Sequence, residues 1–181
     1  MNFKALALAA FTAASGVVAP AMAAAPVATQ AEVQNHAQLA QAIMSTGVQF
    51  YLNKPECEER GAFGWYWAAQ NELVVCQELR DPSRPGVQVS WTEEDLDTLR
   101  HEAHHLVQDC RDTYLNGRLN AVYTDPIGLA KAWLGDRRIA GILNAYAEAS
   151  DHIKVMELEA FSVAAMNDPA EQVRDIQNFC F

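Results

Sequence analysis

The sequence His101-Glu102-Ala103-His104-His105 lies in the middle of a helical pattern in this chain of 181 residues. Apolar residues recur on one side of that pattern, at Leu96, Leu99, Ala103, Leu106, Val107 and Cys110. A capping box is predicted at its start, formed by Ser90 with Glu93 or by Thr92 with Asp95. The segment is therefore predicted to be an amphipathic helix with three histidines near its centre.

The first and last residues of this HExxH motif could bind one metal ion. Side chains four positions apart project from one face of a helix, so His101 and His105 can both reach a tetrahedral Zn²⁺. Glu102 lies about 100° around the helix from His101, near the open position of the ion. Zinc lowers the pKa of water to about 7, so Glu102 is predicted to be the general base of peptide hydrolysis. His104 points to another face and is predicted to pack. The alternative for the whole motif is a solvated helix face without function.

A third metal ligand is predicted in the segment 153–166. Apart from Lys154 and Ser162, its only polar side chains are Glu157 and Glu159. A helix that is apolar almost all round is buried, and a buried carboxylate needs a partner, which a metal ion would supply.

The two segments resemble the pattern of gluzincin metallopeptidases, in which HExxH is followed by a downstream ExxA that here begins at Glu157. In size the chain is similar to the minimal-scaffold gluzincins called minigluzincins. The resemblance implies that His101, His105 and Glu157 bind zinc. It makes Glu102 the general base, and Glu159 remains the competing third ligand.

The chain departs from related patterns at three positions. Metzincins are excluded, because Gln108 and Arg111 stand where that family carries Gly and His. Phe161 stands where many gluzincins carry Asp or Asn, whose side chain hydrogen-bonds a zinc-binding histidine.

The resemblance also implies how a substrate binds. In gluzincins an edge strand takes the peptide as an added antiparallel strand, and residues 72–77 are the predicted counterpart. Tyr146 and His152 precede Glu157 closely enough to be candidate donors of a hydrogen bond to the transition state.

Residues 1–23 have the pattern of a secretory signal peptide. They contain one positive charge at Lys4, an apolar run over 5–14 and small residues at 21–23. The run is too short to cross a bilayer as a helix. Residues 24–181 are therefore predicted to be a single zincin-like domain, secreted or periplasmic.

The charge of the predicted mature chain restricts its partners. Without Lys4, 12 basic residues remain against 23 acidic ones, a net charge of −11. Nucleic acids and anionic membranes are bound by basic patches, so both are excluded, and a peptide or protein substrate is expected.

All four cysteines follow the predicted cleavage site. An even number in an oxidising compartment indicates two disulfides, for which three pairings are possible. We favour Cys57–Cys76, which would brace a hairpin, and Cys110–Cys180, which would tie the C-terminus to the motif helix. A cysteine-based zinc site is disfavoured because the chain contains no CxxC.

The remaining patterns predict an α+β fold. Expected elements are a helix over 31–45, strands over 48–53, 63–67 and 72–76, a hairpin turn over 68–71, a loop over 80–86, and helices starting at Asp125-Pro126, Ser150 and Asp168-Pro169. The order is an N-terminal helix, a small antiparallel three-stranded sheet and a helical bundle that carries the motif and Glu157.

Three functions agree with these features. The first is an exported zinc metalloendopeptidase, which Glu102 favours because a binding protein has no chemical need for a base. The second is a non-catalytic exported zincin-like binding domain. The third is a structural protein held by disulfides, which would bind no metal.

Overall fold

The computed structural model describes residues 26–166 and 168–181, so the predicted signal peptide lies outside the described residues. The elements in chain order are α1 (Gln30–Ser45), β1 (Gln49–Leu52), α2 (Glu56–Arg60), β2 (Gly64–Trp67), the 3₁₀ turn η1 (Ala68–Gln70), β3 (Glu72–Val75), α3 (Glu93–Cys110), α4 (Pro126–Trp133), α5 (Gly135–Ala145), α6 (Asp151–Met166) and α7 (Pro169–Phe179). The predicted α+β class and order of elements are confirmed.

The sheet is mixed, so the prediction of three antiparallel strands is wrong. Its strand order is β1-β3-β2, in which β2 pairs with β3 antiparallel and β1 pairs with β3 parallel. β3 is buried on both faces: Leu73 and Val75 face the main core, and Val74 packs with Trp65 and Cys76 on the other side. Residues 72–75 are thus the central strand, and the predicted edge position of 72–77 is wrong as well. In the described sheet the edge nearest α3 is β2.

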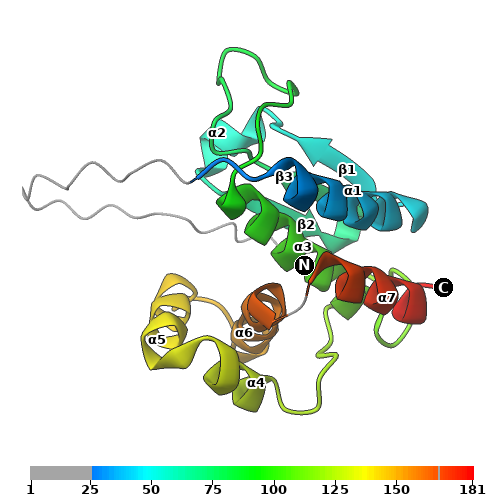
Figure 1. Ribbon diagram of the computed structural model, residues 1–181. Coiled ribbons are helices and arrows are strands. Elements are labelled where there is room, and N and C mark those ends of the chain that lie inside the picture. The colour runs from blue at the N-terminus through cyan, green and yellow to red at the C-terminus, as the bar shows by residue number, and fades with distance from the viewer. Residues whose placement is uncertain (1–25, 167) are drawn as a thin grey trace, which may run out of the picture.

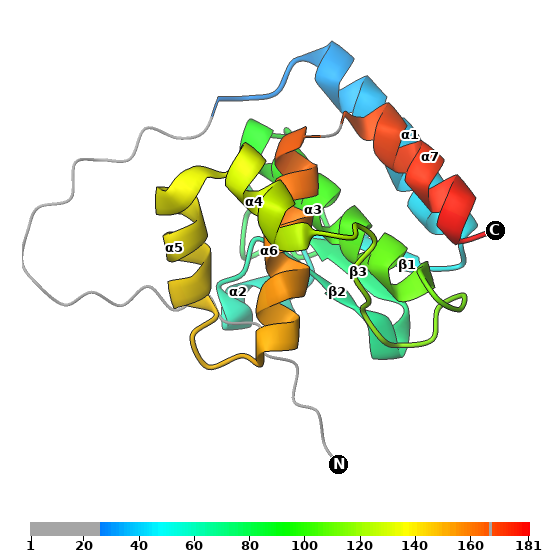
Figure 2. The same cartoon turned by 90° about the horizontal axis from the view of Figure 1, so that it is seen from below.

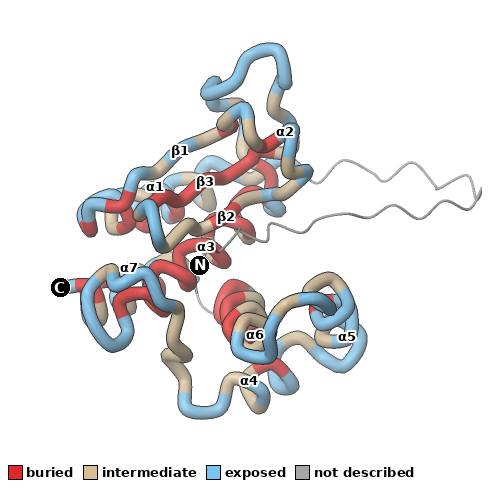
Figure 3. The backbone as a smooth tube through the Cα atoms, turned by 180° about the vertical axis from the view of Figure 1, so that it is seen from behind, coloured by how far each residue is buried: buried red, intermediate tan, exposed pale blue. Residues whose placement is uncertain are grey.

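Helix α3 lies at the centre of the molecule, between the sheet and α6 (Figure 1). Its start is the second of the two predicted capping boxes: the Thr92 hydroxyl accepts from the Asp95 amide at 3.2 Å, and Asp95 Oδ2 accepts from the Thr92 amide at 2.9 Å. The helix packs against β2, β3, α1, α6 and α7, and Figure 3 shows α3 and β3 among the most buried parts of the tube. Side chains on α3 are therefore packed on most sides, including the side that faces α6.

The helices α4, α5 and α6 form the second half of the molecule (Figures 1 and 2). A small core of Ala130, Ile142 and Leu158 joins them. The predicted starts are confirmed: Asp125 and Asp168 cap α4 and α7 ahead of a proline at the first turn. The Ser150 hydroxyl accepts from the Ile153 amide at the start of α6. This half places Glu157 of α6 opposite the motif on α3.

Two disulfides join the pairs that the sequence favours. Cys57–Cys76 ties α2 to the end of β3, and Cys110–Cys180 ties the last residue of α3 to the residue after α7. Both predicted pairings are confirmed. None of the described helices is long and apolar enough to cross a membrane.

Candidate metal centre

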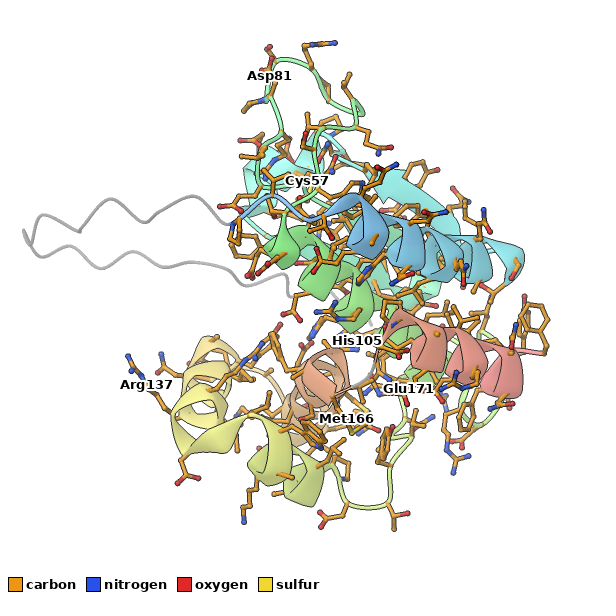
Figure 4. The ribbon with its side chains drawn as sticks, in the orientation of Figure 1. Cys57, Asp81, His105, Arg137, Met166 and Glu171 are labelled. Carbon is orange, nitrogen blue, oxygen red and sulfur yellow. A yellow bond between two sulfur atoms is a disulfide. The ribbon has the colours of Figure 1, made fainter. Side chains whose placement is uncertain are left out.

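The motif histidines and Glu157 meet where α3 packs against α6. His101 Nε2 and His105 Nε2 lie 3.1 Å apart. Glu157 Oε2 lies 3.2 Å from His101 Nε2, and Glu157 Oε1 lies 3.5 Å from His105 Nε2. Figure 4 shows His105 at this junction of the two helices. The predicted ligand residues are thus brought together, although they come from two elements about 50 residues apart in the sequence.

The spacing of these atoms suits a small divalent cation. Zinc bonds of roughly 2.0–2.1 Å give a tetrahedron whose ligand atoms are about 3.3 Å apart, close to the three observed separations. Glu157 Oε2 is buried and forms no hydrogen bond of ordinary geometry with any described residue, despite the nearby His101 nitrogen. Among the described residues, the buried group of His101, Glu102 and His105 has side-chain atoms within 4.8 Å of one another and could bind a metal ion.

Glu102 lies beside the two histidines and close to strand β2. Burial raises the pKa of its carboxyl, while nearby positive charge on His101 and His105 and the backbone N–H of Tyr66 act in the opposite direction. β2 approaches so closely that a Cβ on Gly64 would lie 2.6 Å from the Thr98 methyl and 3.4 Å from Glu102 Cγ. A raised pKa brings a carboxylate closer to the working range of a general base at neutral pH.

The charges of His105 and Glu157 depend on each other. Burial alone would lower the pKa of His105, but the adjacent Glu157 carboxylate outweighs it and raises the pKa of His105 to about 9. Burial would likewise raise the pKa of Glu157, but the charge on His105 holds it well below its usual value. In the metal-free protein the pair therefore shares one proton that a bound cation has to displace.

This shared proton predicts the pH dependence of metal binding. Below about pH 9 zinc binding should release a proton from His105, so the apparent dissociation constant should fall about tenfold per pH unit between pH 7 and 9. Above that range it should level off, because His105 is already neutral. Competition titrations against a chelator of known affinity measure this slope. A constant affinity across the range would contradict the assignment of His105 as a ligand.

Glu159, the competing third ligand, is directed elsewhere. Its side chain is fully buried, and Oε1 accepts the backbone N–H groups of Val122 at 2.8 Å and Tyr123 at 2.7 Å. Oε2 accepts from Gln108 Nε2 at 3.2 Å. The ligand role of Glu157 remains a prediction, but among the two candidates only Glu157 lies within 3.5 Å of both motif nitrogens.

Gln108 is the site residue that the sequence did not single out for this role. Its Oε1 lies 2.8 Å from His105 Nδ1, and its side chain is completely buried. The spacing of three residues on one helix could have indicated the contact with His105, since such side chains are neighbours on a helix surface.

Phe161 takes the place of a polar neighbour for the other histidine. Its ring lies 4.2 Å from the His101 ring, and His101 Nδ1 has no hydrogen-bond partner among the described residues. Phe161 therefore gives His101 an aromatic contact and no hydrogen bond. His104, predicted to pack, is indeed buried, and its Nε2 lies 3.6 Å from Glu159.

The two candidate transition-state donors are placed differently. Tyr146, at the end of α5, is half-buried beside the centre; burial raises the pKa of its hydroxyl, and the negative charges of Glu157 and Glu102 raise it further. His152 is exposed, and its Nε2 lies 2.8 Å from the Leu119 carbonyl. Of these two candidates, only Tyr146 interacts with Glu157 and Glu102.

Comparisons with known proteins find no match for this chain. No family model matches the chain, no curated protein matches it, and no solved structure matches it. The gluzincin resemblance therefore rests on the motif residues of the sequence and stays a prediction.

Proposed function

We propose that this chain is an exported zinc-dependent peptidase that hydrolyses peptide bonds of protein or peptide substrates. The observation that carries the proposal is the position of Glu102, a buried carboxylate within 4.8 Å of two histidine nitrogens that themselves meet Glu157. A protein that only binds metal would gain nothing from a second buried acid at this point, since taking a carboxylate out of water is costly.

The residues divide the chemistry among them. His101, His105 and Glu157 would hold the zinc ion, which when bound supplies Lewis-acid chemistry by polarising the peptide carbonyl and acidifying water. Glu102 takes the proton from the attacking water and delivers it to the leaving amine. The Tyr146 hydroxyl, which keeps its proton, donates a hydrogen bond to the oxyanion that develops from the carbonyl.

The substrate strand is assigned to β2 in place of β3. Phe63 O accepts from the Cys76 amide at 2.8 Å, so in this antiparallel pair the backbone groups of Gly64 and Tyr66 point away from β3. The Tyr66 N–H lowers the pKa of Glu102, so it lies near that carboxylate. A peptide added along the outer edge of β2 would therefore pass the general base.

Export is part of the proposal. Both disulfides are of the kind that persists in oxidising compartments, and the pattern of residues 1–23 supplies a route to one. The zinc site would then be loaded outside the cytoplasm.

Zinc content and cleavage together test the function. The purified protein should hold one zinc ion and cut an unfolded protein, lose cleavage with a chelator and regain it when zinc is returned. Zinc without any cleavage would support the non-catalytic binding domain. No zinc under replete conditions would remove the site altogether.

A further inference from the structure

We infer that Gln108 and Glu159 form a positioning relay that fixes which ring nitrogen of His105 carries the proton. The relay rests on the metal site in the proposed function but not on peptide hydrolysis. Gln108 lies on α3 and Glu159 lies on α6. Both polar atoms of each side chain form hydrogen bonds.

The orientation of the Gln108 amide follows from its surroundings. One end of the amide lies 3.1 Å from the Met156 carbonyl oxygen and 3.2 Å from Glu159 Oε2. The Met156 carbonyl oxygen can only accept, so this end must be the donating –NH₂ group. The other end, Oε1, then has to face His105.

The orientation of Gln108 decides the state of His105. Oε1 lies 2.8 Å from His105 Nδ1 and can only accept, so Nδ1 must carry a hydrogen. The lone pair of the neutral ring is then on Nε2, the nitrogen that lies near His101 and Glu157. Second-sphere hydrogen bonds of this kind orient a ligand histidine and strengthen its bond to a metal.

Glu159 holds the relay in place from the other side. The backbone N–H groups of Val122 and Tyr123 occupy Oε1, which leaves Oε2 for Gln108. Gln108 and Glu159 are both 0% exposed, so water cannot replace a hydrogen bond that either side chain loses. The loop between α3 and α4 is thereby connected to the metal site through one buried carboxylate.

Replacing Gln108 tests the relay. Gln108→Leu should weaken zinc binding on the order of 10-fold or more, measured by competition with a chelator. In ¹⁵N-histidine spectra of the zinc-loaded protein, in which His105 is neutral, the wild type should show a slowly exchanging proton on Nδ1, and in the variant this proton should exchange rapidly. The spectrum gives this result whether or not the protein cleaves peptides.

The matched control is Gln172→Leu. Gln172 is 1% exposed and donates to α3 at the Arg100 carbonyl, and among the described residues no hydrogen bond joins it to a motif histidine. This variant should lose a comparable buried hydrogen bond while keeping zinc affinity and the His105 signal. A parallel loss of zinc affinity in both variants would mean that general destabilisation is responsible, and would overturn the relay.

Exchanging the two relay side chains gives a test that a merely structural role would fail. In Glu159→Gln the amides of Val122 and Tyr123 still bind the side-chain oxygen, so the new –NH₂ group points at the –NH₂ group of Gln108. Two donors facing each other favour rotation of the Gln108 amide. Its –NH₂ group then faces His105 Nδ1 and shifts the hydrogen of the neutral ring to Nε2. Gln108→Glu alone sets two carboxylates side by side. Combined, the substitutions rebuild one donor–acceptor contact and keep an acceptor for His105.

Each single substitution should therefore weaken zinc binding, and the double variant should recover most of the loss. Additive losses in the double variant would overturn the relay, as would a folded Gln108→Leu protein with wild-type zinc affinity. If the wild type binds zinc but cuts nothing, the peptidase proposal fails while these comparisons still decide the relay. If it binds no zinc, the relay fails as a metal-positioning device.

Discussion

Replacing Glu102 with glutamine should reduce the turnover of peptide cleavage roughly 10²–10⁴-fold and leave zinc binding intact. The amide has nearly the shape of the carboxylate, and its oxygen can still face the N–H of Tyr66. It cannot take a proton from water or return one to the leaving amine. The loss should therefore appear in kcat, with zinc content and thermal stability close to those of the wild type.

Two companion variants make this result specific. Glu93→Gln makes the same chemical change at an exposed position of the same helix and should leave cleavage unchanged. His105→Ala should lose zinc and cleavage together. If Glu102→Gln kept more than about a tenth of the wild-type turnover, a general base other than Glu102 would be required.

The motif helix and its caps could be predicted because their causes are local. Thr92 and Asp95 are three residues apart, and their reciprocal hydrogen bonds depend only on the start of one helix. The same holds for Asp125 and Asp168 ahead of their prolines. His101 and His105 converge for the same local reason, since four residues complete about one turn.

The sheet could not be predicted correctly from alternation alone. β1 pairs with β3, although α2 and β2 lie between them in the sequence. Whether that pairing is parallel or antiparallel depends on how the chain runs between Asn53 and Phe63. One signal was present: Leu73 to Cys76 is an unbroken apolar run, which is typical of a strand covered on both faces. Such a run indicates a central strand, whereas an edge strand usually carries polar side chains.

The choice between Glu157 and Glu159 was also beyond the sequence. Both lie in the same apolar helix, two residues apart, and both are buried carboxylates that need partners. The rotation of α6 against α3 decides which one meets the histidines. The partners of Glu159 are backbone amides of Val122 and Tyr123, which carry no side-chain signal that a sequence pattern could reveal.

Removing Cys110–Cys180 should destabilise the protein more than removing Cys57–Cys76. In the loop-entropy account, a disulfide that spans 70 residues stabilises by about 4 kcal/mol and one that spans 19 residues by about 3 kcal/mol. All four cysteines are buried, so each pair is replaced by alanines, which introduce no buried hydroxyl.

Urea unfolding of the metal-free proteins measures both losses without a contribution from bound zinc. Each double variant deletes the same atoms from a buried position, so the difference between them reports the length of the loop that is released. A larger loss for the Cys57–Cys76 pair would contradict this ordering. The Cys110–Cys180 pair also ends α3 two residues beyond Gln108, so its removal should weaken zinc binding as well, whereas the Cys57–Cys76 variant should bind zinc as the wild type does.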